Sequence, residues 1–295
     1  SKFVNHQSLY LRPDPARVVV RPFKPATEPR DLNPTDKVRA NHIVDRVLRL
    51  DAEASAQQLS EVLENFAGRH RNLLDIFESR AAEMEEALEP HAPLSKTQRG
   101  LIGAYFLNEY SFEASALFNP SIVRHPDQTG APGHGCRFIL SLRAVGEGHV
   151  SSLTFRSGTI AADGNVSVDP TARLASVPIV RSRTSIANGD DVEVIFGPDE
   201  ELSERVIFPI TAAQSNGIED ARFVEFNDNG QKTFYATYTA YSGTAIRSEL
   251  LATKDFQSFK MTPLGGSASR NKGMALFPRK IDGRYAMISR QDNEN

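Results

Sequence analysis

Two adjacent carboxylates, Glu219 and Asp220, are the residues best suited to acid–base chemistry in this sequence. They lie within Ser215–Arg222, which leads into the alternating run Phe223–Phe226. A carboxyl group where a loop enters a strand is rigidly held and open to solvent, so the pair is a candidate for acid–base chemistry. Successive side chains of a strand point to opposite faces, so the two carboxylates are not expected to converge on one atom. An ordinary turn, salt-bridged by Arg222, explains the same spacing.

Four basic residues lie where predicted strands begin or end and are candidates for binding an anion. Arginine binds phosphate through two parallel N–H donors and lysine contributes a compact charge, so a group of such residues suits a phosphate dianion. A solvated strand end explains each residue taken singly, and only their shared placement favours a common site. The four are Arg143, Arg270, Lys272 and Arg290.

The composition indicates a chain that can bury a sizeable core and has no strong electrostatic preference. The 295 residues are 40% hydrophobic, with a formal net charge of -3 and a pI near 6.2. Neither nucleic acid nor a membrane is therefore expected as a partner. No apolar run reaches the roughly 20 residues of a membrane-spanning helix, and the first residues lack the apolar segment of a signal peptide. The single Cys136 excludes an internal disulfide, and we expect a cytoplasmic protein.

Residues 30–110 show the apolar spacing of helices, after a short β-branched run at Val18–Val20 that predicts a strand. This helical segment is expected to pack on the rest of the chain or on a second copy, so that a homo-oligomer is possible. Its first predicted helix follows Asn33-Pro34, the second ends at Gly68, the third ends before Pro90, and the fourth begins at a capping box of Ser95 and Gln98.

From Asn119 onward the apolar residues alternate, and Gly- and Asp-rich turns separate them, which predicts a β region. Two of three predicted hairpins lie about fifty residues apart, a spacing typical of propeller blades. The sequence therefore predicts a mainly β fold: an arm and helical segment over 1–110 and a five-bladed β-propeller over 111–295, only part of which this chain covers. The predicted hairpins join Ile122–Val123 to Phe138–Arg143, Phe223–Phe226 to Phe234–Thr239, and Leu276–Phe277 to Arg284–Arg290.

Four ordered stretches resemble glycoside hydrolase family 130, the inverting β-mannoside phosphorylases and β-mannosidases. The resemblance spans residues 118–290, and it implies a five-bladed propeller acting on β-linked mannosides. The helical segment is similar to an N-terminal extension found in some members. Three positions differ from the family's pattern: Leu142 replaces an aromatic residue, Ala221 a proline and Ser289 a histidine. The stretches are Phe118–Ser121, Leu142–Ala144, Gly217–Arg222, and Arg270–Lys272 with Leu276–Lys280.

The resemblance also implies roles for individual residues. Asp220 matches the family's proton donor, which acts through a hydroxyl of the bound mannose, and Glu219 is expected to be structural or to orient the sugar. Other candidate sugar contacts lie near strand ends, although Asn119 could instead brace a turn and Tyr241 could belong to the core. The expected phosphate contacts are Arg143, Arg290 and either Asn271 or Lys272, with Arg270 beside them. The expected sugar contacts are Asn119, Glu147 and Tyr241.

Three functions remain open at this point. Phosphate as nucleophile requires no protein base, so inorganic phosphate is the expected co-substrate and no other cofactor is predicted. Water as nucleophile would require a general base, expected in a glutamate pair beyond residue 295. The departures at Ala221 and Ser289 favour a third alternative, a non-catalytic propeller that binds glycans or proteins.

Two other motifs do not support a site. His134, Cys136 and His149 fit no standard zinc spacing. The Gly-rich stretch Gly265–Lys272 lacks the Gly-Lys-Ser/Thr ending and the following helix of a nucleotide-binding loop.

Overall fold

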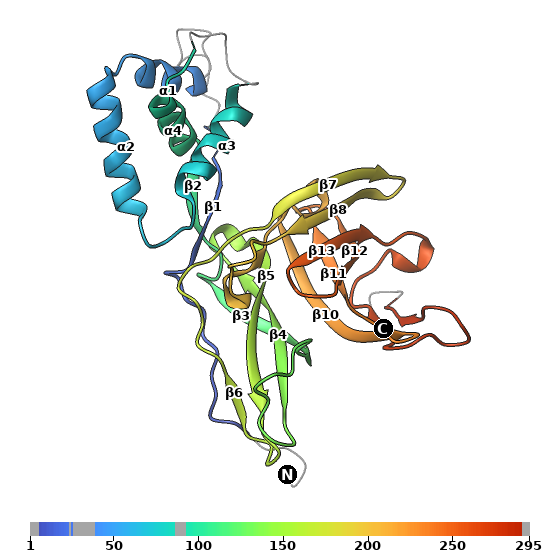
Figure 1. The fold of residues 1–295 in the computed structure, drawn as a ribbon. Helices are drawn as coiled ribbons and strands as arrows, with labels where there is room; N and C mark the ends of the chain where they lie inside the picture. The colour runs from blue at the N-terminus through green and yellow to red at the C-terminus, as the bar shows by residue number, and fades with distance from the viewer. Residues whose placement is uncertain (1–5, 24, 26–38, 86–92, 291–295) are drawn as a thin grey trace. The chain divides into compact units, whose positions relative to one another are not determined.

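A computed structural model describes residues 6–23, 25, 39–85 and 93–290. These residues fall into two compact units (Figure 1). One unit is Val18–Tyr110, and the other combines Ser1–Arg17 with Ser111–Asn295. No helix in the described ranges is long and apolar enough to cross a membrane.

The first unit is helical, as the apolar spacing predicts. Val44, Leu101 and Phe106 are among its buried core residues. The predicted capping box is confirmed, because Ser95 and Gln98 exchange side-chain and backbone hydrogen bonds. The predicted start at Asn33-Pro34 and the stop before Pro90 lie outside the described residues. The helices are α1 (Arg39–Leu48), α2 (Ala52–Phe66), α3 (Leu73–Glu85) and α4 (Lys96–Tyr105).

A small two-stranded sheet accompanies the helices. The predicted strand at Val18–Val20 is confirmed as β1 (Val18–Pro22), which pairs with β2 (Leu107–Ser111). β1 is rich in β-branched residues, which favour the extended backbone.

The second unit is built on one mixed sheet of eleven strands. The main path runs β3-β4-β5-β10-β11-β12-β13-β8-β7, with β6 and β9 both paired to β5. The contact of β5 with β10 is parallel and joins Ser151 to Gly217, whereas the other pairings along the path are antiparallel. The bounds are β3 (Ala116–Arg124), β4 (Cys136–Val145), β5 (Ser151–Ile160), β6 (Val166–Val168), β7 (Ile179–Ile186), β8 (Gly189–Ile195), β9 (Val206–Ile207), β10 (Gly217–Asp228), β11 (Gln231–Tyr241), β12 (Ile246–Thr253) and β13 (Ser258–Pro263).

The first two predicted hairpins are confirmed as β3–β4 and β10–β11. The third exists but is much shorter than predicted: β14 (Ala275–Leu276) pairs with β15 (Met287–Ile288) in a separate two-stranded sheet. Most residues between these two strands are exposed, so little apolar burial extends the pairing. The protein is thus mainly β with a helical segment, and the division of its strands into five blades stays a prediction.

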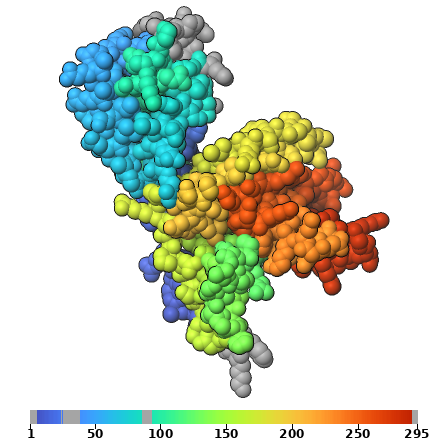
Figure 2. All heavy atoms as spheres, in the orientation of Figure 1, coloured from blue at the N-terminus to red at the C-terminus, as the bar shows by residue number. Residues whose placement is uncertain are grey.

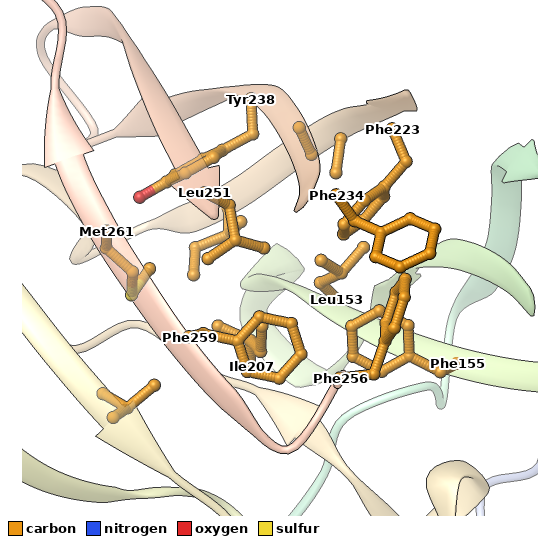
Figure 3. Close-up of a cluster of buried hydrophobic side chains, with 14 of the residues drawn as sticks. Leu153, Phe155, Ile207, Phe223, Phe234, Tyr238, Leu251, Phe256, Phe259 and Met261 are labelled. Carbon is orange, nitrogen blue, oxygen red and sulfur yellow. The ribbon is translucent and has the colours of Figure 1, made fainter. Parts of the chain in front are cut away.

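Aromatic side chains fill the core of the sheet unit (Figure 3). The ring of Phe256 lies at its centre, with centroids 5.0 Å from Phe234, 5.5 Å from Phe223 and 5.8 Å from Phe155. Phe256 lies in the β12–β13 turn, where its N–H donates to Thr253 Oγ1. Because Phe223 belongs to β10 and Phe234 to β11, this core fixes the strands that carry the candidate acid.

The far edge of the sheet is the β7–β8 hairpin, seen in Figure 2 as a yellow lobe of the sheet unit. Every residue of β7 is exposed. β7 therefore contributes no buried residue, whereas β8 contributes Val192 and Val194 to the core.

Candidate active site

The site is built on two β-bulges that carry matching polar residues. In β3, Asn119 and Pro120 lie opposite one residue of β4, and in β10, Asp220 and Ala221 lie opposite one residue of β11. The first residue of each bulge has a left-handed backbone, with φ of 49° at Asn119 and 54° at Asp220. Asn and Asp adopt this conformation more readily than other non-glycine residues. Both side chains are thereby turned out of the regular alternation of their strands.

The two bulges meet through a short hydrogen bond. Asn119 Nδ2 donates to Asp220 Oδ1 over 2.5 Å. Arg143, from β4, donates to the same oxygen over 3.1 Å and to Glu219 Oε1 over 2.9 Å. The two carboxylates do not share one atom, as expected from the alternation of a strand, but both bind the guanidinium of Arg143, because the bulge after Glu219 interrupts that alternation.

Arg143 is held firmly between these carboxylates and its own neighbours. Its Nε donates to Ser151 Oγ over 3.0 Å, and its guanidinium lies 5.1 Å from the centroid of the Phe118 ring. The side chain is 18% exposed. The predicted alternative of a turn salt-bridged by Arg222 does not describe this site, since the carboxylates pair with Arg143 and Arg222 is exposed.

Gly217 is required where β10 begins beside β5. Its φ is +150°, and a Cβ at this position would lie 2.9 Å from both N and Cβ of Ser151. A side chain would therefore push β10 away from the residue that supports Arg143. The glycine that opens the acidic motif thus has a packing role as well as a conformational one.

The cationic part of the site comes from the segment after β13. Lys272 Nζ lies 4.0 Å from Glu219 Oε2. Arg290 Nη2 donates to Asn271 Oδ1 over 3.3 Å, while Arg290 Nε is buried without a hydrogen-bond partner in the described part of the chain. Ser248 Oγ anchors this segment by donating to Asn271 O over 2.7 Å. A buried donor without a partner is costly, so Arg290 is suited to receive an anion.

A cavity of about 740 Å³ opens beside these groups. Its lining combines Asn119, Asp220, Lys272 and Arg290 with apolar side chains such as Ile122 and Leu276. Arg143 and Glu219 adjoin the cavity through their contacts with Asp220 and Lys272. The cavity is large enough for a sugar, and its polar groups gather around Asp220.

The structure does not bring every predicted residue to this cavity. Arg270 is exposed and lies outside the lining, and so does Glu147, in the short 3₁₀ turn Glu147–His149. The hydroxyl of Tyr241 donates to Gly243 O over 2.9 Å, within its own loop. Their predicted roles stay predictions.

Two supporting serines were not predicted as site residues. Ser151 holds Arg143, and Ser121 Oγ accepts a hydrogen bond from Phe223 N over 2.8 Å, which ties β3 to β10. Ser121 lies in the Phe118–Ser121 stretch that resembles the family, so the sequence contained a signal for it. Ser151 carries no local signal, because its role depends on the pairing of β5 with β4 and β10.

Comparison with known proteins adds an independent line of evidence. Residues 192–295 match the family model of glycoside hydrolase family 130, described as beta-1,4-mannooligosaccharide phosphorylase. A segment of 86 residues is 33% identical to a beta-1,2-mannobiose phosphorylase from Listeria innocua, and it covers 28% of this chain. The matched segment spans 22% of the length of that relative. No solved structure matches the chain.

Proposed function

We propose that the protein cleaves β-linked mannosides by phosphorolysis with inversion, on the premise that its segment from residue 192 to residue 295 belongs to glycoside hydrolase family 130. The observation that carries the proposal is a convergence of residues from separate parts of the chain. Asn119 and Arg143 lie outside the matched segment, yet both bind Asp220 within it. A site assembled from both parts is what the four ordered motifs predict.

In the proposed reaction the bond between the mannose C1 and the leaving oxygen breaks. A phosphate oxygen forms the new bond to C1 from the opposite face, and a proton passes from Asp220, through a mannose hydroxyl, to the leaving oxygen. The products are mannose 1-phosphate and the shortened acceptor. Asp220 is the acid in this scheme, and Asn119 and Arg143 orient it through Oδ1.

The charges around the cavity favour phosphate over water as the nucleophile. Among the described residues that line it, Asp220 is the sole carboxylate and Arg222, Lys272 and Arg290 are cationic, while Glu219 and Arg143 adjoin it as an ion pair. Inverting hydrolysis needs a second carboxylate as base, and phosphorolysis needs cations that hold a dianion. We propose Lys272 and Arg290 as direct phosphate ligands, with Asn271 positioning Arg290 and Arg143 completing the set.

The finer features of the proposal follow the family. The two names found by comparison differ in linkage, β-1,4 in one and β-1,2 in the other, so the proposed substrate class is a β-mannoside of either linkage. The proposed fold of the sheet unit is the five-bladed propeller.

Asp220→Asn tests the assignment of the acid. We expect the variant to lose mannose 1-phosphate formation by about a hundredfold or more, the range that positioned acids contribute. The fold should persist, because the Asp220 side chain is 38% exposed. The matched control is Asp228→Asn, in the same strand but paired with Lys280 over 2.6 Å. Unchanged turnover in Asp220→Asn, or equal losses in both variants, contradicts the proposal.

A further inference from the structure

Glu219 occupies the place between two cations where a bound anion would lie. Its Oε1 accepts from Arg143 Nη2 over 2.9 Å, and its Oε2 lies 4.0 Å from Lys272 Nζ. The two cations are proposed phosphate ligands, and the Glu219 side chain is only 13% exposed. The Glu219 carboxylate therefore already neutralises part of the positive charge of Arg143 and Lys272 that a bound phosphate would neutralise.

We propose that Glu219 is an internal competitor of phosphate, which phosphate displaces from Arg143 and Lys272 when it binds. This inference rests on the proposed phosphorolysis and adds a role for a residue otherwise expected to orient the sugar. A dianion with three acceptor oxygens makes stronger contacts to a guanidinium and an ammonium than one carboxylate does.

Displacement of Glu219 has a consequence for the acid. Arg143 holds Glu219 and Asp220 with its two terminal nitrogens, while its Nε is fixed on Ser151 Oγ. A phosphate that engages Arg143 must therefore exchange with one or both carboxylates. Exchange at Nη2 displaces Glu219 and leaves Asp220 bound to Asn119 and to Nη1 of Arg143, so that the acid keeps both of its orienting partners when the nucleophile binds.

The surroundings of Glu219 confine the competition between Glu219 and phosphate to Arg143 and Lys272. The charged groups in contact with it are Arg143 of β4 and Lys272, and the adjacent acid in β10 is Asp220. The other glutamate of β10 is Glu225, which pairs with Lys232 over 2.6 Å and touches neither phosphate cation. Glu225 is thus a matched control for the loss of one negative charge from the same strand.

The inference is tested by calorimetric titration of inorganic phosphate at constant ionic strength. Glu219→Gln should bind phosphate about tenfold tighter than the unchanged protein, the size of a typical coupling between contacting groups. Glu225→Gln should bind it as the unchanged protein does. In an Arg143→Gln background, the gain from Glu219→Gln should fall to about threefold or less, since only the contact with Lys272 remains. Thermal unfolding of each variant shows whether it is folded. Glu219→Ala provides a second variant without a negative charge at this position.

The possible outcomes separate the two proposals. Phosphate affinity that Glu219→Gln leaves unchanged or weakens overturns the inference alone. A gain that persists in full with Arg143→Gln also overturns it, because the effect then acts through space rather than through the shared arginine. Absence of phosphate binding in every variant, together with release of free mannose, contradicts the proposed phosphorolysis itself.

Discussion

Asn119 and Asp220, 101 residues apart in the chain, are joined by a hydrogen bond of 2.5 Å between two bulges with left-handed backbones. Arg143 donates to the same Oδ1 oxygen of Asp220. Among the described residues, no donor reaches Oδ2. In the proposed reaction, Asp220 is therefore held through Oδ1 and exchanges its proton through Oδ2.

Asn119→Gly should separate this orienting role from a merely structural one. Glycine keeps the left-handed backbone and removes only the amide. We expect kcat for mannoside phosphorolysis to fall about tenfold to hundredfold, as when a supporting partner of a reactive group is lost. The melting temperature should change little, because Asn119 is exposed. An unchanged kcat would show that Arg143 alone orients the acid.

Gly217→Ala should damage both stability and activity. The new Cβ would lie 2.9 Å from backbone and side-chain atoms of Ser151, at a φ of +150° that alanine rarely adopts. We expect a loss of about 1–3 kcal/mol in the free energy of unfolding, measured by urea denaturation. The control is Gly133→Ala, where an added Cβ meets nothing within 4 Å and φ is not positive. Similar effects of the two substitutions would contradict the proposed packing role.

Tyr238 should make the stability of the sheet unit fall at alkaline pH. Burial, together with the carboxylate of Glu249, raises the pKa of Tyr238 well above its ordinary value of 10.0. The folded state therefore keeps a proton that the unfolded chain releases above about pH 10. The stabilisation that this proton gives the folded state is complete below pH 10, and it is lost as pH rises toward the pKa of Tyr238 in the folded state.

Tyr238→Phe tests this linkage in urea denaturation between neutral pH and pH 11, about one unit above the ordinary tyrosine pKa. The decline above pH 10 should become shallower but persist, because the pKa values of Tyr235, Lys260 and Lys280 are also raised. At neutral pH the variant should lose about 1–3 kcal/mol, since Glu249 loses a buried donor. If the free energy of unfolding fell equally steeply with pH in the variant and in the unchanged protein, Tyr238 would not contribute to the decline.

The buried ion cluster of the sheet unit should be intolerant of losing its acid. Glu113 is fully buried between Arg17 and Arg156 and binds both. Burial lowers the pKa of Arg156 to about 10, so the guanidinium stays charged at neutral pH. Glu113→Gln would leave two buried cations without an anion and should cost about 3–5 kcal/mol. Glu83→Gln, which removes the pairing of an exposed glutamate with Arg80, should cost about 1 kcal/mol or less, and equal losses would contradict this account.

Features determined by neighbouring residues could be predicted from the sequence. The capping box of Ser95 and Gln98 is local, and so is the turn of the second hairpin, where Asn229 and Gly230 both have positive φ. The convergence of Asp220 with Arg143 was implied by resemblance and is present in the structure. Each of these features depends on residue types at fixed short spacing or on an ordered set of motifs.

Features determined by strand pairing could not be predicted. The bulge at Asp220 is a property of strand pairing, in which two residues of β10 face one residue of β11. The sequence of β10 alone does not predict it. The sequence does hold a weak signal, since Asn119 and Asp220 are types that tolerate a left-handed backbone. The length of the third hairpin was overestimated for a related reason. The Asp282-Gly283 turn is local, whereas the length of its strands depends on burial, and most of the connecting residues are exposed.

The most direct test of the account is to identify the sugar product from β-1,2-, β-1,3- and β-1,4-linked mannobiose, with and without inorganic phosphate. The account predicts mannose 1-phosphate in the α configuration from at least one of these substrates, formed only when phosphate is present. Free mannose released equally fast without phosphate would instead indicate a β-mannosidase. Saturable binding with neither product would identify a glycan-binding protein and contradict the central claim.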